Sequence, residues 1–166
     1  SNVIFRYFNA AGADPNGDLG EDHTPETHLI PLIIEALINK NKEIKIFGTD
    51  YQTFDGTCIR DFIHVSDLGD AHVLGLEKII SNGGSKIYNL GTGKGHSVLE
   101  IINIAKQISG EELSIKRDQR RIGDPPNLVA DASKAAKELN WNPINSDIET
   151  IIKHAWLWHK NNYKIY

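Results

Sequence analysis

The chain has 166 residues and a net charge of −4, with 40% apolar and 24% charged residues. This ordinary composition gives no general electrostatic attraction to nucleic acid or to an anionic membrane. No apolar run approaches the roughly 20 residues that span a bilayer, and the first residues lack the pattern of a secretory signal. Cys58 is the only cysteine, so no internal disulfide can form and a reducing, cytoplasmic location is expected.

The first half of the chain predicts strands alternating with one helix. Residues 3–8 are β-branched and aromatic, which predicts a strand, and residues 9–27 are rich in Gly, Asp, Asn and Pro, which predicts a long loop. The Leu- and Ile-rich run 29–40 predicts a helix with a proline in its first turn. Short strands are predicted at 44–47 and 59–65, on either side of a polar loop with an Asp-Gly turn.

The second half predicts more helix than strand. The elements follow in the order helix 66–80, strand 86–90, helix 97–109, strand 113–116, helix 131–139 and helix 146–160. The expected helix caps are Ser66, Asp131, the capping box of Ser97 with Glu100, and the capping box of Ser146 with Glu149. The alternation of strands and helices predicts an α/β fold, and the few short strands predict the edge of a larger sheet plus a small satellite domain.

The sequence contains no methionine and opens directly on a predicted strand. We therefore expect a processed chain or a part of a longer protein.

A glycine-rich stretch, GTGKG at residues 91–95, lies between a predicted strand and a predicted helix. This is the context of a phosphate-binding loop. The spacing fits neither standard pattern, because a dinucleotide loop needs another glycine at position 96 and a P-loop needs Ser or Thr directly after Gly-Lys. The favoured interpretation is a tight strand-to-helix turn, with a phosphate loop as the alternative.

Metal and thiol chemistry have little support in the sequence. The seven histidines do not fall at spacings that are typical of metal sites, so no metal site is expected. Cys58 has no other Cys or His in a metal-binding register. A small buried or loop residue is the favoured interpretation of Cys58, and a reactive nucleophile is the alternative.

Arginines near predicted strand ends offer an anion site. Arg60 lies in a strand directly after a polar loop, and Arg120 and Arg121 lie in a loop. The guanidinium group binds phosphate oxygens through two parallel hydrogen bonds. Salt bridges of Arg60 with Asp61 and of Arg120 with Asp118 are the alternative, and spacing alone does not choose between them.

Several stretches together resemble the UDP-glucose 4-epimerases, a family of extended short-chain dehydrogenase/reductase enzymes. In family order they are RYFN at 6–9, GDLGED at 17–22, DGTCIRDFIHVSDL at 55–68, YNLG at 88–91, RRIGD at 120–124, DASK at 131–134 and LNW at 139–141. RYFN is shared by many enzymes that act on nucleotide sugars, whereas the GED loop combined with DGTxxRDxIHV is much more specific. The likeness covers essentially the whole chain.

The resemblance implies a partial Rossmann-like sheet edge plus a small α/β substrate-binding domain. It also implies an enzyme that interconverts UDP-galactose and UDP-glucose through a transient 4-keto sugar, with NAD as its cofactor. Residues 1–166 would be its C-terminal UDP-sugar-binding part, and the N-terminal NAD-binding half would lie outside this sequence. Another nucleotide-sugar epimerase or dehydratase, or a non-catalytic nucleotide-sugar-binding module, is the alternative.

The family's glycine-rich NAD loop and its Tyr-x-x-x-Lys pair are missing from this sequence. The chain is therefore assigned no catalytic residue, and in isolation it is expected to bind UDP at most. A homodimer is expected for the full-length enzyme, and self-association through open strand edges is expected for this chain.

Mapped by motif, the resemblance implies a set of contacts to the UDP-sugar. These residues are Asn9, His28, Leu29, Lys45, Ile46, Phe47, Arg60, Arg121, Asp124 and Leu128. Arg60 and Arg121 match the two arginines that bind the diphosphate, and Asp124 matches the carboxylate that accepts hydrogen bonds from the ribose. Leu128 matches a position that sets the size of the hexose pocket, which implies some tolerance for N-acetylated hexoses. Phe8 matches a position beside the nicotinamide of NAD.

Overall fold

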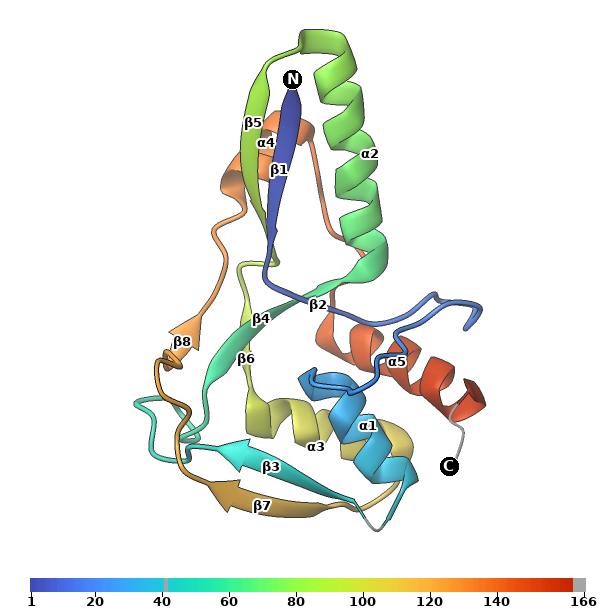
Figure 1. Cartoon of the computed structure of the whole chain (residues 1–166), viewed down its shortest axis with the longest axis vertical. Coiled ribbons are helices and arrows are strands. Elements are labelled where there is room, and N and C mark those ends of the chain that lie inside the picture. The colour runs from blue at the N-terminus through green and yellow to red at the C-terminus, as the bar shows by residue number, and fades with distance from the viewer. Residues whose placement is uncertain (41, 163–166) are drawn as a thin grey trace.

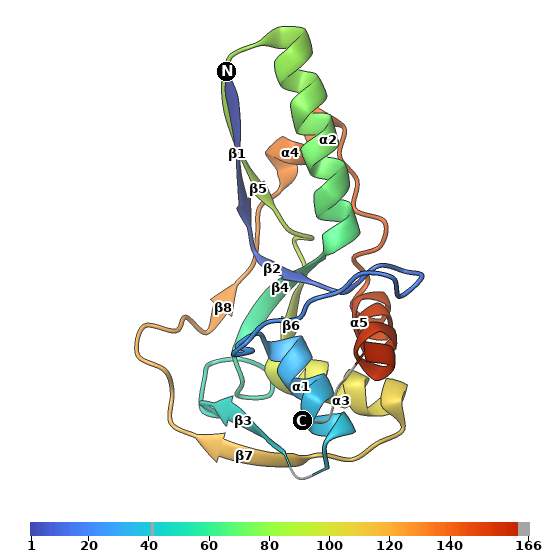
Figure 2. The ribbon, with the colours of Figure 1, turned by 45° about the vertical axis from the view of Figure 1, so that its right-hand side comes forward.

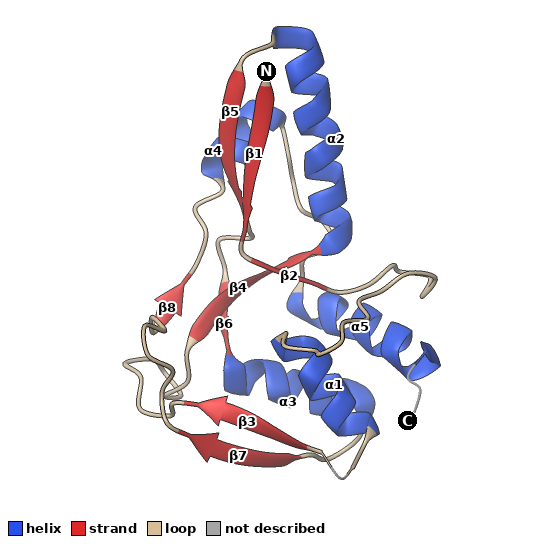
Figure 3. Ribbon diagram, viewed as in Figure 1, coloured by secondary structure: helices blue, strands red, loops and turns tan. Residues whose placement is uncertain are grey.

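The chain forms two groups of elements that are joined by a short central sheet (Figure 1). The computed structural model describes residues 1–40 and 42–162. Strands and helices occur in both groups (Figure 3), so the predicted α/β class is confirmed. No helix in the described part of the chain has both the length and the apolar character needed to cross a membrane.

The upper group in Figure 1 is a pair of parallel strands with helices on one side. Its elements are β1 (Asn2–Tyr7), α2 (Val65–Asn82), β5 (Ser85–Leu90) and α4 (Ser133–Leu139). Phe5 and Tyr88 turn toward α2 and α4 and pack in a core with Leu68 and Leu139. The opposite face of the strand pair stays open, because side chains alternate between the two faces of a strand.

The central sheet is built on β4, which crosses the middle of the molecule (Figure 2). Its strands are β2 (Asn9–Ala11), β4 (Ile59–His64), β6 (Gly95–Ser97) and β8 (Asn127–Leu128). β4 pairs in parallel with β2 and β8, and antiparallel with β6. Neighbouring residues of β4 serve different cores, since Phe62 packs into the lower core and Ile63 into the upper core.

The lower group contains three helices beside a second pair of parallel strands. Its elements are α1 (Leu29–Ile38), β3 (Glu43–Phe47), α3 (Val98–Ser109), β7 (Ser114–Asp118) and α5 (Ile148–Asn162). The three helices bury a shared apolar core that includes Ile33, Ile34, Ile101, Ile102 and Ile151. Burial of these branched side chains is the main force that holds α1 beside the strands of the candidate site.

The glycine-rich turn at 91–95 binds a carboxylate of the protein itself. Asp61 is fully buried on β4, and its carboxylate accepts hydrogen bonds from the Thr92 and Gly93 amides at 2.9 Å and from the Ala130 amide at 3.1 Å. Gly91 has no room for a side chain, since a Cβ there would lie 2.8 Å from an oxygen of Asp61. The turn amides are therefore already bound to an anion, which supports the strand-to-helix turn over the phosphate loop.

Most predicted helices and strands are present, and the differences lie at their ends. The residue that caps α2 is His64 rather than Ser66, because the His64 ring accepts a hydrogen bond from the Ser66 amide at 3.0 Å. The predicted capping box of Ser146 and Glu149 is absent. The Ser146 hydroxyl instead binds Asp67, and the Asp147 carboxylate accepts from the Thr150 amide at the start of α5.

Two other predictions about local structure have opposite outcomes. The capping box of Ser97 and Glu100 is confirmed at the start of α3. Residues 9–27 are not entirely loop, because residues 9–11 form β2 by pairing with β4.

Candidate functional site

A cavity of about 690 Å³ opens between α1, β3 and β4. Its size falls within the range of small-molecule sites, about 300–1,000 Å³. It collects side chains from segments that are far apart in the sequence. Eight of its lining residues are ones that the sequence predicts: Asn9, His28, Leu29, Lys45, Phe47, Arg60, Arg121 and Asp124.

Arg60 is held in place on the wall of this cavity. Its guanidinium forms an ion pair with Asp124 and donates a hydrogen bond of 2.6 Å to the Ile59 carbonyl. The Arg60 side chain is only 12% exposed, so its conformation is fixed before any ligand arrives. The predicted alternative partner was wrong, because the carboxylate of Asp61 is turned inward to the glycine-rich turn.

Arg121 supplies a second, more exposed cation at the same cavity. Its guanidinium carbon lies 4.0 Å from the centre of the Phe47 ring, in a cation–π arrangement. It forms an ion pair with none of the residues 1–40 and 42–162. Arg121 therefore presents its charge to the cavity, where a phosphate group can bind it through two hydrogen bonds.

Its neighbour Arg120 points elsewhere. Arg120 pairs with Asp50 at 2.7 Å and lies over the Tyr51 ring, with 4.3 Å between its guanidinium carbon and the ring centre. The hydrogen bond from Arg120 lowers the pKa of the Asp50 carboxyl. The predicted alternative pairing of Arg120 with Asp118 is thus wrong, and only the second arginine of the pair reaches the cavity.

The first turn of α1 also faces the cavity, through His28 and Leu29. His28 is the N-cap residue, and its side chain makes no capping hydrogen bond. The first turn contains no acidic residue. A helix N-terminus carries partial positive charge, and the Glu26 carboxylate already binds there, accepting from the Thr27 amide at 2.6 Å and from the His28 amide at 2.7 Å.

The β4 wall of the cavity is lined by Cys58, Arg60 and Phe62. These residues are two apart, so the alternation of a strand places them on one face. Cys58 and Phe62 were not predicted as site residues. Their spacing of two residues from Arg60 is the sequence pattern that could have placed them on the same wall. Burial raises the pKa of the Cys58 thiol. The thiolate is therefore disfavoured, which supports the interpretation of Cys58 as a small packing residue.

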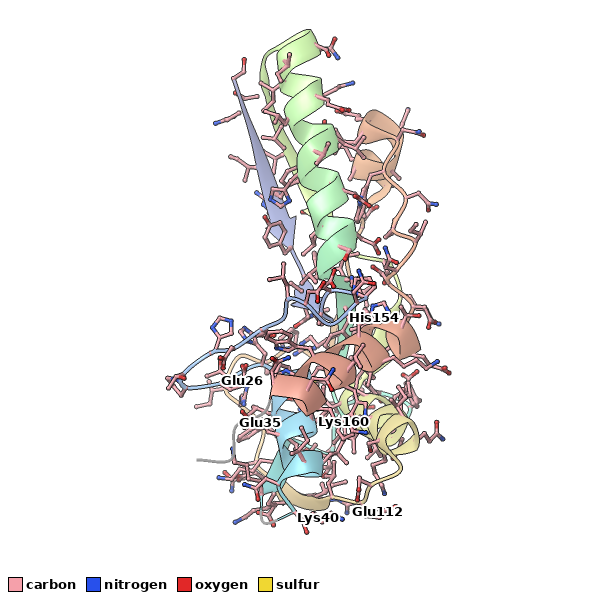
Figure 4. All side chains as sticks on the ribbon, turned by 90° about the vertical axis from the view of Figure 1, so that its right-hand side faces the viewer. Glu26, Glu35, Lys40, Glu112, His154 and Lys160 are labelled. Atoms are coloured by element: carbon pink, nitrogen blue, oxygen red, sulfur yellow. The ribbon has the colours of Figure 1, made fainter. Side chains whose placement is uncertain are left out.

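Acidic residues also line the cavity. Glu26, Glu35 and Glu43 border the cavity, and Figure 4 shows Glu26 and Glu35 at the same end of the molecule as α1. None of them is predicted by motif. Glu35 is paired with Lys42 at 2.8 Å, so part of this charge is neutralised. The cavity thus contains carboxylates as well as the cations of Arg60 and Arg121.

Three predicted site residues do not line the cavity. Ile46 is 3% exposed and packs into the lower core. Leu128 is 46% exposed on β8, next to Arg60 in the strand register. Phe8 is partly buried between β1 and β2, and its amide donates to the Leu90 carbonyl at 3.1 Å.

Comparison with known proteins identifies the family. Residues 1–91 match the sequence profile of the NAD dependent epimerase/dehydratase family. The chain belongs to this family. The match to this epimerase/dehydratase profile contains β2, α1, β3 and β4, which supply most of the cavity wall.

The epimerase/dehydratase chain is similar to proteins of about twice its length. It is 49% identical over 160 residues to the UDP-glucose 4-epimerase of Halalkalibacterium halodurans, covering 96% of this chain and 48% of that one. A crystal structure of a UDP-glucose 4-epimerase superposes with a TM-score of 0.94 at 50% identity, covering 99% of this chain and 50% of that one.

A third similar protein was solved with its ligands. The Bifidobacterium longum UDP-glucose 4-epimerase, in complex with NAD+ and UDP, has a TM-score of 0.87 at 39% identity, covering 96% of this chain and 48% of that one. The epimerase/dehydratase chain thus spans about half the length of the curated relatives it matches.

The Thr92 and Gly93 amides of the glycine-rich turn are already bound to Asp61 and are not free for a cofactor phosphate. Phe8 is the one position that motif comparison associates with the cofactor. The cavity instead has the donors of an anion site, with Arg60 and Arg121 on its wall.

Proposed function

We propose that this chain holds the UDP-sugar in a UDP-glucose 4-epimerase, which interconverts UDP-galactose and UDP-glucose with bound NAD. The relatives that match nearly the whole chain carry that name. The observation that carries the proposal is the placement of Arg60 and Arg121 on one cavity, with Phe47 stacked against Arg121. A diphosphate needs the cations, and a planar base or sugar needs an apolar surface beside them.

The residues divide the work by position. Arg60, fixed by Asp124, meets the phosphate with little loss of side-chain entropy. Arg121 adds a charge from a loop, and Asn9 is oriented by a 2.7 Å hydrogen bond to the Asp61 carbonyl. Firm binding of the nucleotide tethers the sugar while its ring is free to reorient, which suits an enzyme that attacks both faces of one carbon. NAD supplies hydride transfer when bound in the whole enzyme.

Calorimetric titration of the chain with UDP tests the proposal. We expect binding in the micromolar range for the wild type. Arg121→Ala removes a charge-assisted contact, so it should weaken binding at least about tenfold. Arg120→Ala is the matched control. It removes the same side chain one residue away, where it pairs with Asp50 outside the cavity, and it should leave UDP affinity unchanged.

Two results are incompatible with this assignment. One is equal weakening by Arg120→Ala and Arg121→Ala, which means that general positive charge rather than the cavity binds UDP. The other is no UDP binding by a chain whose circular dichroism shows it to be folded. Uridine without phosphate should bind far more weakly than UDP, because the arginines then have no anion to meet.

Other properties of the whole enzyme stay predictions. They are a homodimeric assembly, a cytoplasmic location and absence of epimerisation by the 166-residue chain alone. Tolerance for N-acetylated hexoses is a further one, motivated by Leu128. The tolerance is tested by assaying the full enzyme on UDP-N-acetylglucosamine. Absence of turnover above background would contradict it.

A further inference from the structure

The loop between β2 and α1 gathers metal-binding side chains that histidine spacing does not predict. Glu21, His23 and His28 each offer a donor atom, and the three atoms lie within 4.8 Å of one another. Glu21 Oε1 is 3.2 Å from His23 Nε2 and 2.5 Å from His28 Nδ1. The sequence between these donors matches no common metal motif, so only the path of the loop brings them together.

The backbone that carries Glu21 is fixed against α5. Trp158 donates its indole N–H to the Glu21 carbonyl at 3.2 Å. Gly20 lies so close to the Trp158 ring that an added Cβ would be 2.2 Å from it. The next element, α1, fixes His28 at its N-cap position. Two of the three donors are therefore anchored to helices of the lower core, and the cluster is more than a chance encounter on a free loop.

The charges of the cluster favour a cation at its centre. His28 Nδ1 lies between two carboxylates, 2.5 Å from Glu21 Oε1 and 3.0 Å from Glu26 Oε1. A neutral imidazole carries one ring hydrogen, so one Nδ1 cannot donate fully to both oxygens. A metal ion between Glu21 and His28 would offer several coordination positions, and Glu26 would add negative charge beside it.

We propose that Glu21, His23 and His28 bind a zinc ion. One carboxylate with two imidazoles is a donor set that zinc takes where it keeps a position open. Bonds of about 2.0–2.2 Å in tetrahedral geometry put the donors about 3.4 Å apart, so the short Glu21–His28 separation has to widen by under about 1 Å. His23 and His28 are 57% and 55% exposed, which leaves their rings free to make that shift.

The ion would lie at the boundary between two cavities. Glu21, His23 and His28 line a second cavity of about 550 Å³, bordered by Gly12, Asp14 and Ser66. His28 also lines the cavity of the arginines. Zinc would therefore fix the loop 12–27 and the start of α1 relative to both cavities. The inference stands on this cluster alone and does not depend on the nucleotide that the larger cavity binds.

Titration of the metal-free chain with ZnCl₂, followed by calorimetry, tests the inference. We expect one ion per chain, and Co²⁺ in its place should give the intense visible bands of a four-coordinate site. His23→Ala and Glu21→Gln should each weaken zinc binding at least about tenfold, as loss of a metal ligand does. His72→Ala is the matched control, because His72 is exposed on α2 outside the cluster and should leave zinc affinity unchanged.

Thermal unfolding gives an independent readout. Excess Zn²⁺ should raise the melting temperature of the wild type and of His72→Ala, and should have little effect on His23→Ala. Since His23 is an exposed loop residue, its substitution leaves the cores intact, and circular dichroism verifies this. No zinc binding by the folded wild type overturns the inference. Zinc binding that is unchanged in both His23→Ala and Glu21→Gln would also overturn the inference.

Discussion

Tyr51 and Tyr88 are both buried, but their hydroxyl groups are in opposite situations. The Tyr88 hydroxyl donates a 2.9 Å hydrogen bond to Glu138, and burial together with that carboxylate raises the Tyr88 pKa to about 12. The Tyr51 hydroxyl has no hydrogen-bond partner in the described part of the chain, and burial raises its pKa. A buried polar group without a partner costs free energy, whereas a satisfied one contributes it.

The two tyrosines therefore predict opposite effects of one substitution. Tyr88→Phe should lower the free energy of unfolding by about 1 kcal/mol, and Tyr51→Phe should leave it unchanged or raise it by up to about 1 kcal/mol. Urea denaturation of both variants measures this difference. Each variant loses one phenolic oxygen and nothing else, so each serves as the control for the other. Equal destabilisation would show that the Tyr51 hydroxyl does have a partner.

His64 predicts a pH dependence of stability. It is fully buried, and its Nδ1 accepts from the Ser66 amide. Its Nε2 lies 3.0 Å from Nδ1 of His154 on α5, which is labelled in Figure 4. Burial, and then His154, lowers the His64 pKa, although Asp67 acts in the opposite direction. The ring is thus neutral in the fold, with its proton on Nε2.

The sign of the effect follows from linkage. Below the unfolded pKa of about 6.5, the unfolded chain binds a proton that the folded His64 resists. Stability from this site is therefore present above about pH 6.5 and is lost as the pH falls, at no more than about 1.4 kcal/mol per pH unit. Urea unfolding between pH 7.5 and 5 should show a shallower loss in His64→Asn, which retains an acceptor for the Ser66 amide. Identical slopes would refute the assignment.

At the scale of elements, buried carboxylates fix segments that have no regular structure. Asp67, in the first turn of α2, accepts hydrogen bonds from the Ile144 and Asn145 amides and from the Ser146 hydroxyl. Asp61 does the same for the turn at 91–95. Much of the DGTCIRDFIHVSDL stretch is therefore scaffold, and Arg60 is its cation at the cavity.

Asp67→Asn tests this role. An amide replaces one acceptor oxygen with a donor that faces other donors, so the free energy of unfolding should fall by about 2–3 kcal/mol. Asp70→Asn, an exposed carboxylate on the same helix, should change it by less than about 0.5 kcal/mol. Chemical denaturation compares the two. A loss in Asp67→Asn as small as in Asp70→Asn would mean that water satisfies residues 144–146 equally well.

The contrast between predicted and observed elements has a physical cause. The long helices follow from apolar periodicity and from caps such as Ser97, which are local signals. β2, β6 and β8 have only two or three residues and exist through pairing with β4, which no local pattern reveals. Short strands depend on distant partners, so they were missed or read as loop.

The residues of the candidate site also differ in whether a local sequence pattern could predict them. Arg60 and Arg121 were predicted from motifs, and both lie on the cavity. Ile46 was assigned by position in a motif, and it packs into the lower core together with Ile44. The cluster of Glu21, His23 and His28 depends on a loop path that is set by Trp158, more than 100 residues later in the chain, so sequence spacing did not reveal it.

At the scale of the molecule, the β1–β5 pair leaves an apolar face uncovered. Ile4 and Ile87 lie opposite each other in the strand register and are 47% and 42% exposed. No other described strand pairs with β1 or β5. Parallel strands are normally covered on both faces, and free strand edges favour pairing with another chain.

We therefore expect the isolated chain to self-associate through this face. Sedimentation equilibrium should give an average mass that rises with protein concentration. Ile4→Glu should shift the chain toward the monomer, whereas Leu19→Glu, at an exposed loop position away from the strand pair, should not. A monomer at every concentration in the wild type would rule this out.

The sharing of β4 between two cores has a consequence for how the gene can change. Phe62 and Ile63 face opposite cores, and Arg60 shares its face with Phe62. Loss or gain of a single codon between Arg60 and Phe62 would turn both Phe62 and Ile63 to the other face, so that packing in both cores fails together. A point substitution at one of these positions changes a single side chain, so its effect on stability is smaller than that of a shift in register. We expect descendants of this gene to vary in length in surface loops but never inside this strand.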